Sequence, residues 1–158
     1  DYTVYCKADG LKGKRLGVEK KKYDNQFLNR LLEKAIADLK QQGAEVVELE
    51  YLEKLNALGD AEFELMKFEF KAGLNQYLST SNAKLKTIDE VIAFNKANED
   101  QVMPTFKQET MVASAEKEGL YSKAYKEAYA KSHLGSKKLI DEVLQQNKVD
   151  ALIGLTMG

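Results

Sequence analysis

The sequence predicts an α/β fold with a small parallel sheet, built from a βαβ unit, a large helical insertion and a late third strand. An apolar run at 16–18, an amphipathic helix and an alternating segment at 45–51 follow one another, and strands joined by such a crossover lie parallel. Residues 60–148 carry helical periodicity almost throughout. Residues 149–155 form a near-continuous apolar run, which is typical of a parallel strand covered on both faces.

The βαβ unit is outlined by local signals. Residues 1–13 are expected to form an irregular lead-in to the first strand at 14–18. Asp24 is the expected N-cap of the helix, whose apolar residues recur at intervals of three and four until Gly43, the expected left-handed residue at its end. Segment 45–51 alternates apolar residues with glutamates, which predicts a strand with one solvated face at the edge of the sheet.

Four helices are predicted between residues 60 and 148. The second opens with Thr87-Ile-Asp-Glu90, a capping box in which side chains satisfy the first amides. The third is expected to begin at Pro104, because proline suits the first helical position. The fourth covers 122–147 and can bend at Gly135, since glycine weakens a helix interior.

The last strand is expected to be central, beside the first strand, and the strand order to be 45–51, 14–18, 149–155. The chain begins at Asp1 rather than Met and stops at Gly158 directly after the apolar run. We therefore expect an excised or processed piece of a longer protein.

Composition predicts one soluble globular domain, 1–158, or a fragment of a larger protein. The 24 basic and 25 acidic side chains leave a net charge of -1, and no apolar run reaches the roughly 18 residues of a membrane span. Neither nucleic acid nor a membrane is an expected partner. The single Cys6 and single His133 exclude a disulfide framework and most zinc sites. We expect no cofactor, and the scarcity of cysteine favours the cytoplasm.

Two basic features near the N-terminus are candidates for anion binding. The segment from Gly10 to Gly17 is superficially similar to a phosphate loop, but it precedes a strand and has no Ser or Thr after the lysine, which favours a plain turn. A cluster of six cations is offset by flanking acids and is interpreted as a solvated rim. The cluster consists of Lys12, Lys14, Arg15, Lys20, Lys21 and Lys22.

Isolated nucleophiles and bases form no recognisable catalytic set. His133 has Ser132 and Ser136 nearby, but neighbouring helical side chains point apart, which favours a half-exposed structural histidine. Cys6 is supported only by Lys7 and is expected to be buried or unreactive. Carboxylate pairs are interpreted as solvated helix faces and a repeat of tyrosines as a core stripe. These residues are Glu62 with Glu64, Asp141 with Glu142, and Tyr121, Tyr125 and Tyr129.

Several segments, in the correct order, resemble one family, the amidase signature hydrolases, which cleave carbon–nitrogen amide bonds. The segments are Asp1-Tyr-Thr with 10–18, 43–47, 68–78, 87–95, 103–109 and 150–158, and together they cover essentially the whole chain. The family usually has proline where this chain has Leu155. The resemblance implies that the fold is a fragment of the amidase signature fold.

The resemblance also implies that the parent protein is an amidase. The family's chemistry uses a lysine and two serines, one of them in a cis peptide, within a Gly/Ser-rich stretch that this sequence lacks. The Ser-rich segment 79–81 contains no glycine. We assign no catalytic residue, because the Lys-Ser-Ser groups that activate the nucleophile for acyl transfer are missing from the chain.

The resemblance therefore implies a non-catalytic segment that completes the sheet and the substrate cleft of a larger hydrolase. Its expected partners are the remainder of that amidase and the amide substrate, and an incomplete sheet also favours self-association. Ligands bind beyond the carboxyl ends of parallel strands, so Thr156 and Gly158 are candidate substrate-binding residues; a mere turn leaving the sheet is an equal interpretation. The alternative, from another class, is a stand-alone binding or assembly module with a flavodoxin-like sheet and no enzymatic activity.

Overall fold

The computed structural model describes residues 1–155, which form two compact units. The first unit consists of residues 1–57 and 137–155 and is called the sheet unit below. The second consists of residues 58–136 and is called the helical unit. The sheet unit contains the segments whose apolar residues alternate, as in strands. The helical unit contains segments whose apolar residues recur every three or four residues, as in helices.

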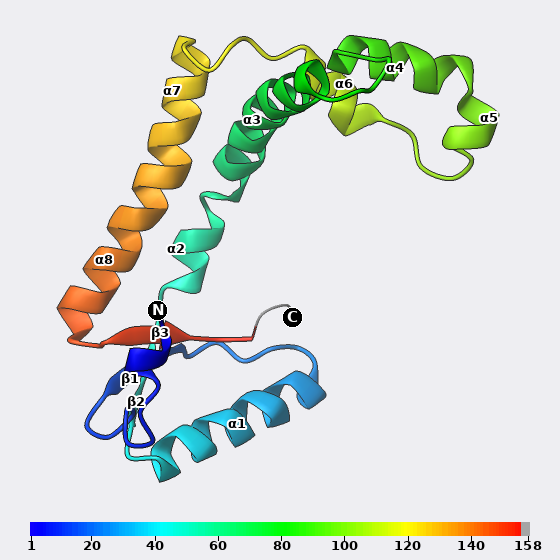
Figure 1. The fold of residues 1–158 in the computed structure, drawn as a ribbon. Helices are drawn as coiled ribbons and strands as arrows, with labels where there is room; N and C mark the ends of the chain where they lie inside the picture. Colours follow the sequence, from blue (N-terminus) through cyan, green and yellow to red (C-terminus); the bar gives the residue numbers. More distant parts are fainter. Residues whose placement is uncertain (156–158) are drawn as a thin grey trace. The chain divides into compact units, whose positions relative to one another are not determined.

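The sheet unit contains three parallel strands in the order β2-β1-β3, which confirms the predicted order (Figure 1). The strands are β1 (Arg15–Glu19), β2 (Glu45–Leu49) and β3 (Ala151–Ile153). The three middle residues of β1 are buried, as expected for the central strand. Gly17 lies at the middle of the sheet, opposite Val47 on one side and Leu152 on the other.

The prediction that the last strand is central was wrong. β3 covers only three residues of the predicted 149–155 and pairs with one side of β1. Its Ala151 is exposed, and the next two residues are only half-buried. A continuous apolar run indicates how hydrophobic a strand is and not where it lies within the sheet. Part of that run, Val149, is buried in the core before β3 begins.

β2 lies on the other side of β1, so the prediction of an edge strand is confirmed among the described strands. It ends at Leu49 rather than at Tyr51, because the chain turns there into α2 (Leu52–Asn56), a short helix that was not predicted. The lead-in also contains a 3₁₀ turn, η1 (Thr3–Tyr5), where an irregular segment was expected. Asp1 caps this turn by accepting hydrogen bonds from the backbone N–H and the hydroxyl of Thr3.

Helix α1 (Gln26–Gln41) connects β1 to β2, and its N-cap is Asn25 rather than the predicted Asp24. The Asn25 side chain accepts a hydrogen bond of 2.8 Å from the N–H of Phe27. Asp24 lies outside the helix. The Asn29 carboxamide binds both the N–H and the C=O of the preceding residue, Tyr23, and holds Tyr23 in a non-helical loop. At the other end Gly43 has φ +90°, which confirms the predicted left-handed residue.

The core of the sheet unit lies between the sheet and the last helix, α8 (Gly135–Asn147). Leu49, Val143 and Val149 are its buried residues, and half-buried apolar side chains pack around them. The apolar stripe of α1 is less well covered, because no residue of that helix is fully buried and Phe27 is 63% exposed.

The helical unit is organised around α3 (Gly59–Thr80), which contacts α6 and α7 and buries Leu65, Phe68 and two further apolar residues. The other helices are α4 (Ile88–Ala97), α5 (Glu99–Val102), α6 (Glu109–Ala115) and α7 (Lys123–Tyr129). The capping box at Thr87 and Glu90 is confirmed. A further hydrogen bond from the N–H of Ile88 to the Asn75 side chain, at 2.8 Å, joins α4 to α3.

The predicted start of the third helix differs from the structure, whereas the start of the fourth agrees with it. The third helix begins at Glu109 rather than at Pro104, because Gln108 donates a hydrogen bond to the carbonyl of Ile92 and holds the preceding segment against α4. The fourth predicted helix begins as expected with Ser122 as N-cap. A bend was expected at Gly135, and the structure has a π-helical turn, η2 (Ala130–Leu134), directly before α8, which begins at that glycine.

Candidate functional site

The carboxyl ends of the three strands border a hollow of about 390 Å³ in the sheet unit. Parallel strands place these ends at one edge, and open parallel sheets hold ligands there. The lining includes Glu19 at the end of β1, Tyr51 after β2, and Gly154 after β3. Tyr23 and Leu32 close the hollow from the α1 side.

Glu19 organises this edge. Its carboxylate accepts hydrogen bonds from the backbone N–H of Tyr51 at 2.9 Å, of Leu52 at 2.7 Å and of Lys21 at 3.2 Å. Burial raises the pKa of Glu19, but these backbone donors together outweigh burial and leave the pKa below its usual value. Glu19 is therefore ionised, and its carboxylate fixes the start of α2. In the sequence, Glu19 was noted only as a residue that flanks an apolar run.

Tyr51 also lines this hollow, and its hydroxyl is neutral. Burial raises the pKa of its phenol, and the nearby Glu19 and Tyr23 raise it further. The group therefore stays protonated at neutral pH and can donate a hydrogen bond.

The basic cluster near β1 is largely neutralised, as predicted. Lys14 pairs with Asp150 and Lys20 with Glu50, each at 3.2 Å. Arg15 pairs with Glu45, and Lys22 pairs with Glu33 at 3.5 Å. Because the segment from Gly10 to Gly17 leads into β1 and not into a helix, it also lacks the arrangement of a phosphate loop.

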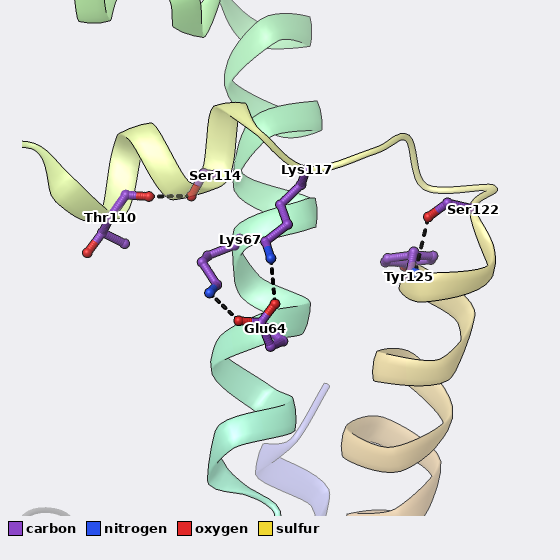
Figure 2. A network of polar contacts seen from close by, with 7 residues as sticks. All are labelled: Glu64, Lys67, Thr110, Ser114, Lys117, Ser122 and Tyr125. Carbon is purple, nitrogen blue, oxygen red and sulfur yellow. Dashed lines mark hydrogen bonds and ion pairs between the residues drawn. The ribbon is translucent and has the colours of Figure 1, made fainter.

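A polar network in the helical unit centres on Glu64, whose carboxylate lies between Lys67 and Lys117 (Figure 2). Hydrogen bonds from Lys117, at 2.6 Å, and from Lys67 hold the pKa of Glu64 below its usual range. The Glu64 side chain is 43% exposed and Glu62 is exposed, so both lie on a solvated face as expected. The pairing of Glu64 with Lys117 was not predicted, because Lys117 lies 53 residues away in the sequence.

Lys71 of α3 also contacts the C-terminal end of α6. Its ammonium donates hydrogen bonds to the carbonyl of Ala115, the last residue of α6, at 2.7 Å, and to the carbonyl of Lys117, just after the helix, at 2.5 Å. A cation at the C-terminal end of a helix satisfies carbonyls that have no partner within the helix. Together with Glu64, Lys71 holds the end of α6 on α3.

The helical unit also contains a pocket of about 470 Å³ between α3, α6 and the segment that joins α5 to α6. Its lining is mainly phenylalanine and methionine, with Lys67, Asn95 and Gln108 among the polar side chains. No motif indicated this pocket, since its residues come from three separate stretches of sequence, 63–70, 95 and 102–114.

The structure does not bring His133 into a catalytic arrangement. The imidazole is exposed and stacks on the ring of Tyr129, with the ring centres 4.8 Å apart. The Ser136 hydroxyl donates instead to the carbonyls of Ser132, at 2.6 Å, and His133, at 3.3 Å. Ser132 is buried. The geometry favours the structural interpretation of His133, with the ring exposed rather than half-exposed.

The other candidate side chains serve local structure. Ser79 and Ser81 donate to carbonyls of the last turn of α3. Cys6 is exposed and not buried, and its thiol contacts the carbonyl of Tyr2 at 3.8 Å. Asp141 and Glu142 pair with lysines one turn earlier on an exposed helix face, as predicted.

The prediction that three tyrosines form a core stripe is only partly correct. Tyr125 and Tyr129 are half-buried, and Tyr125 meets the buried Phe68 edge-on at 5.9 Å. Tyr121 is 92% exposed, because it precedes the N-cap Ser122 and lies outside α7.

Thr156 and Gly158, the candidate substrate-binding residues, lie outside the described residues. Within residues 1–155, His, Cys, Asp and Glu side chains form no group of three that could hold a metal ion. None of the helices in this same stretch is both long and apolar enough to cross a membrane.

Comparison with known proteins finds similarity to amidases along nearly the whole chain, although no family model matches it. A probable amidase of Arabidopsis thaliana is 29% identical over 160 residues, covering 98% of this chain and 30% of that protein. The peptide amidase of Stenotrophomonas maltophilia is 35% identical, with a TM-score of 0.87 over 96% of this chain and 31% of its own. An amidase family protein of Bacillus anthracis is 26% identical, with a TM-score of 0.72 over 96% of this chain and 30% of its own. The chain therefore spans about three tenths of the length of these relatives.

Proposed function

Because this chain is a segment of the amidase signature fold, we propose that it completes the sheet and the substrate cleft of an enzyme that hydrolyses carbon–nitrogen amide bonds, without supplying catalytic groups itself. The observation that carries the proposal is the match of nearly the whole chain to three tenths of a peptide amidase, combined with the absence of a Gly/Ser-rich stretch from its sequence.

The geometry of the sheet unit supports a role at the cleft. The three strands end at one edge, where the hollow beside Glu19 and Tyr51 is open to a ligand. Glu19 is committed to backbone amides and Tyr51 is protonated, so these groups can shape and hydrogen-bond but cannot act as a base at neutral pH. Under this proposal, the remainder of the amidase carries out the proton transfer.

The same geometry argues against catalysis by this chain alone. Acyl transfer needs a hydroxyl within hydrogen-bond reach of a base, together with oxyanion donors. Ser79, Ser81 and Ser136 donate to backbone carbonyls, and Ser114 donates to the carbonyl of Thr110. The similarity to amidases along 96% to 98% of the chain favours this proposal over a stand-alone binding module.

A chimera tests the proposal. The matching 31% of the Stenotrophomonas maltophilia peptide amidase is replaced by this chain, and hydrolysis of a peptide amide is measured for the chimera, the unmodified enzyme and this chain alone. We expect activity from the chimera and none above the uncatalysed background from this chain.

Two outcomes would contradict the proposal. A chimera that is folded by circular dichroism and monodisperse, yet inactive, would remove the role at the cleft. Turnover by this chain alone that disappears on replacing Ser79, Ser81 or His133 with alanine would show that it is catalytic.

A further inference from the structure

The pocket of the helical unit combines a mainly apolar lining with one acidic side chain. Its volume of about 470 Å³ lies within the range of roughly 300 to 1,000 Å³ that is typical of ligand pockets. All of its lining residues lie between positions 63 and 114, so the whole site belongs to one unit. Its apolar part includes three methionines and three phenylalanines, which are Met66, Met103, Met111, Phe63, Phe70 and Phe106.

The acidic residue of the lining is Glu109, in the first turn of α6. Its side chain is exposed. Among residues 1–155, no ion pair and no side-chain hydrogen bond involves the Glu109 carboxylate, whereas the lysines of the same lining are paired. A carboxylate only accepts hydrogen bonds, so this group is open to a cationic donor.

The two lysines of the lining are engaged with carboxylates that do not belong to it. Lys67 pairs with Glu64, and its side chain is only 12% exposed. Lys107 pairs with Glu99 at 2.5 Å. Glu64 also pairs with Lys117, but Lys117 is not a lining residue. The charge of the lining that is left for a ligand is therefore the negative one.

The pocket already holds one ammonium group against an aromatic ring. The Lys67 ammonium lies 5.0 Å from the centre of the Phe63 ring, within the distance of about 6 Å that is typical of a cation–π contact. In the part of the chain that the structure describes, no such contact involves Phe70 or Phe106, which are 45% and 85% exposed. These two rings are therefore open to the cation of a ligand.

Exposure indicates which part of the pocket suits the charge of a ligand. Ser114 and Met103 are 1% and 8% exposed, whereas Phe106 and Glu109 are both exposed. An ammonium group on the exposed side keeps part of its hydration and avoids the cost of burying a charge. The apolar group of the same ligand then occupies the buried part, where methionine side chains adapt to groups of different shape.

We propose that this pocket binds an organic cation, namely an ammonium group that carries an aromatic or branched apolar substituent. The ammonium group pairs with Glu109 and contacts the exposed ring of Phe106, and the substituent fills the part lined by methionines. The site lies within the helical unit alone, and the inference does not rest on the proposed function.

The test is binding to the full chain 1–158, followed by NMR of methionine methyl groups labelled with ¹³C. The probe is 2-phenylethylammonium, 2-phenylethanol replaces its ammonium by a hydroxyl at nearly the same shape, and 3-phenylpropanoate carries the opposite charge. We expect the signals of Met66, Met103 and Met111 to shift saturably with the probe. The alcohol should bind about ten-fold more weakly, because it forms neither the ion pair nor the cation–π contact, and the anion more weakly still.

Substitutions of exposed side chains separate the two contributions. Glu109→Gln should weaken binding of the cation about four-fold and leave binding of the alcohol unchanged. Glu116→Gln is the matched control, because Glu116 is an exposed residue at the other end of α6 that does not line this pocket. Phe106→Leu keeps an apolar wall but removes the ring, so it should weaken binding of the cation about three-fold relative to the alcohol. Circular dichroism checks that each variant is folded.

The proposal is overturned if the three methionine signals do not saturate with the cation, or if the alcohol or the anion binds as tightly. It is also overturned if Glu109→Gln binds the cation like Glu116→Gln, or if Phe106→Leu weakens binding of the cation and the alcohol equally. Signals that change with protein concentration in the absence of probe would overturn it as well, because a second copy would then occupy the pocket.

Discussion

Arg15 and Asp150 exchange two hydrogen bonds, although they lie 135 residues apart in the sequence. The N–H of Arg15 donates to the Asp150 carboxylate at 2.8 Å, and the N–H of Asp150 donates to the carbonyl of Arg15 at 2.7 Å. The carboxylate thus takes the place of a backbone acceptor and fixes the start of β3 beside β1.

This pair makes stability depend on pH. The N–H of Arg15, followed by the Lys14 ammonium, lowers the pKa of Asp150, so the carboxylate stabilises the fold above the ordinary aspartate pKa of about 4. That contribution disappears as the pH falls through the folded-state pKa. We expect Asp150→Asn to be less stable than the unchanged chain at pH 7, with a smaller difference at pH 3, in urea unfolding. An equal difference at both pH values would contradict this.

A side chain at Gly17 is predicted to overpack the centre of the sheet. A Cβ atom there would lie 2.5 Å from Cδ1 of Leu49 and 2.8 Å from Cδ2 of Leu152. Gly17→Ala should therefore cost about 1–3 kcal/mol of unfolding free energy through overpacking. Gly73→Ala is the control, because nothing lies within 4 Å of its Cβ position inside α3, and it should be stabilising. Equal stabilities of the two variants would refute the packing argument.

The sheet unit is predicted to self-associate when the chain is isolated. In α1, Phe27 is 63% and Leu31 47% exposed, and the outer side of β3 has no partner strand within residues 1–155. Sedimentation velocity at micromolar concentration should show a dimer or larger species, which Leu31→Lys should shift toward monomer. A clean monomer that binds no hydrophobic dye would mean that the exposed groups attract no partner.

Thr156 remains a predicted contact of the substrate in the full-length amidase. Thr156→Val removes the hydroxyl at nearly constant shape, so the ratio kcat/KM should fall while the melting temperature stays almost unchanged. Kinetics with several amides would measure this. Unchanged constants for all of them would leave Thr156 a structural residue.

Local signals predicted much of the fold correctly. Gly43 needs a positive φ, and Thr87 with Glu90 satisfies the first amides of a helix, so their positions could be inferred from a few neighbouring residues. The parallel pairing of β1 with β2 also followed, because a βαβ crossover restricts the possible topologies. The amidase resemblance is confirmed by the similarity to the peptide amidase.

Features that depend on distant residues could not be inferred. Pro104 suits a helix start, but Gln108 is held by Ile92, which delays the helix. Glu64 lies on a solvated face as expected, but its ion pair with Lys117 joins residues 53 apart and no local pattern indicates it. The pocket beside Asn95 is likewise assembled from separated segments, each of which resembles an ordinary helix face.

The burial of Lys67 and Lys117 beside Glu64 also sets a pattern of chemical reactivity. Their side chains are 12% and 24% exposed, whereas that of Lys123 is 89% exposed. An acylating reagent must approach a free amine, so in the folded chain Lys123 would be modified early while Lys67 and Lys117, shielded and engaged with a carboxylate, would be modified late. The relative extent of labelling of these three amines, followed by mass spectrometry over time, therefore shows whether α3 and the segment after α6 are still in contact, without any assay of function.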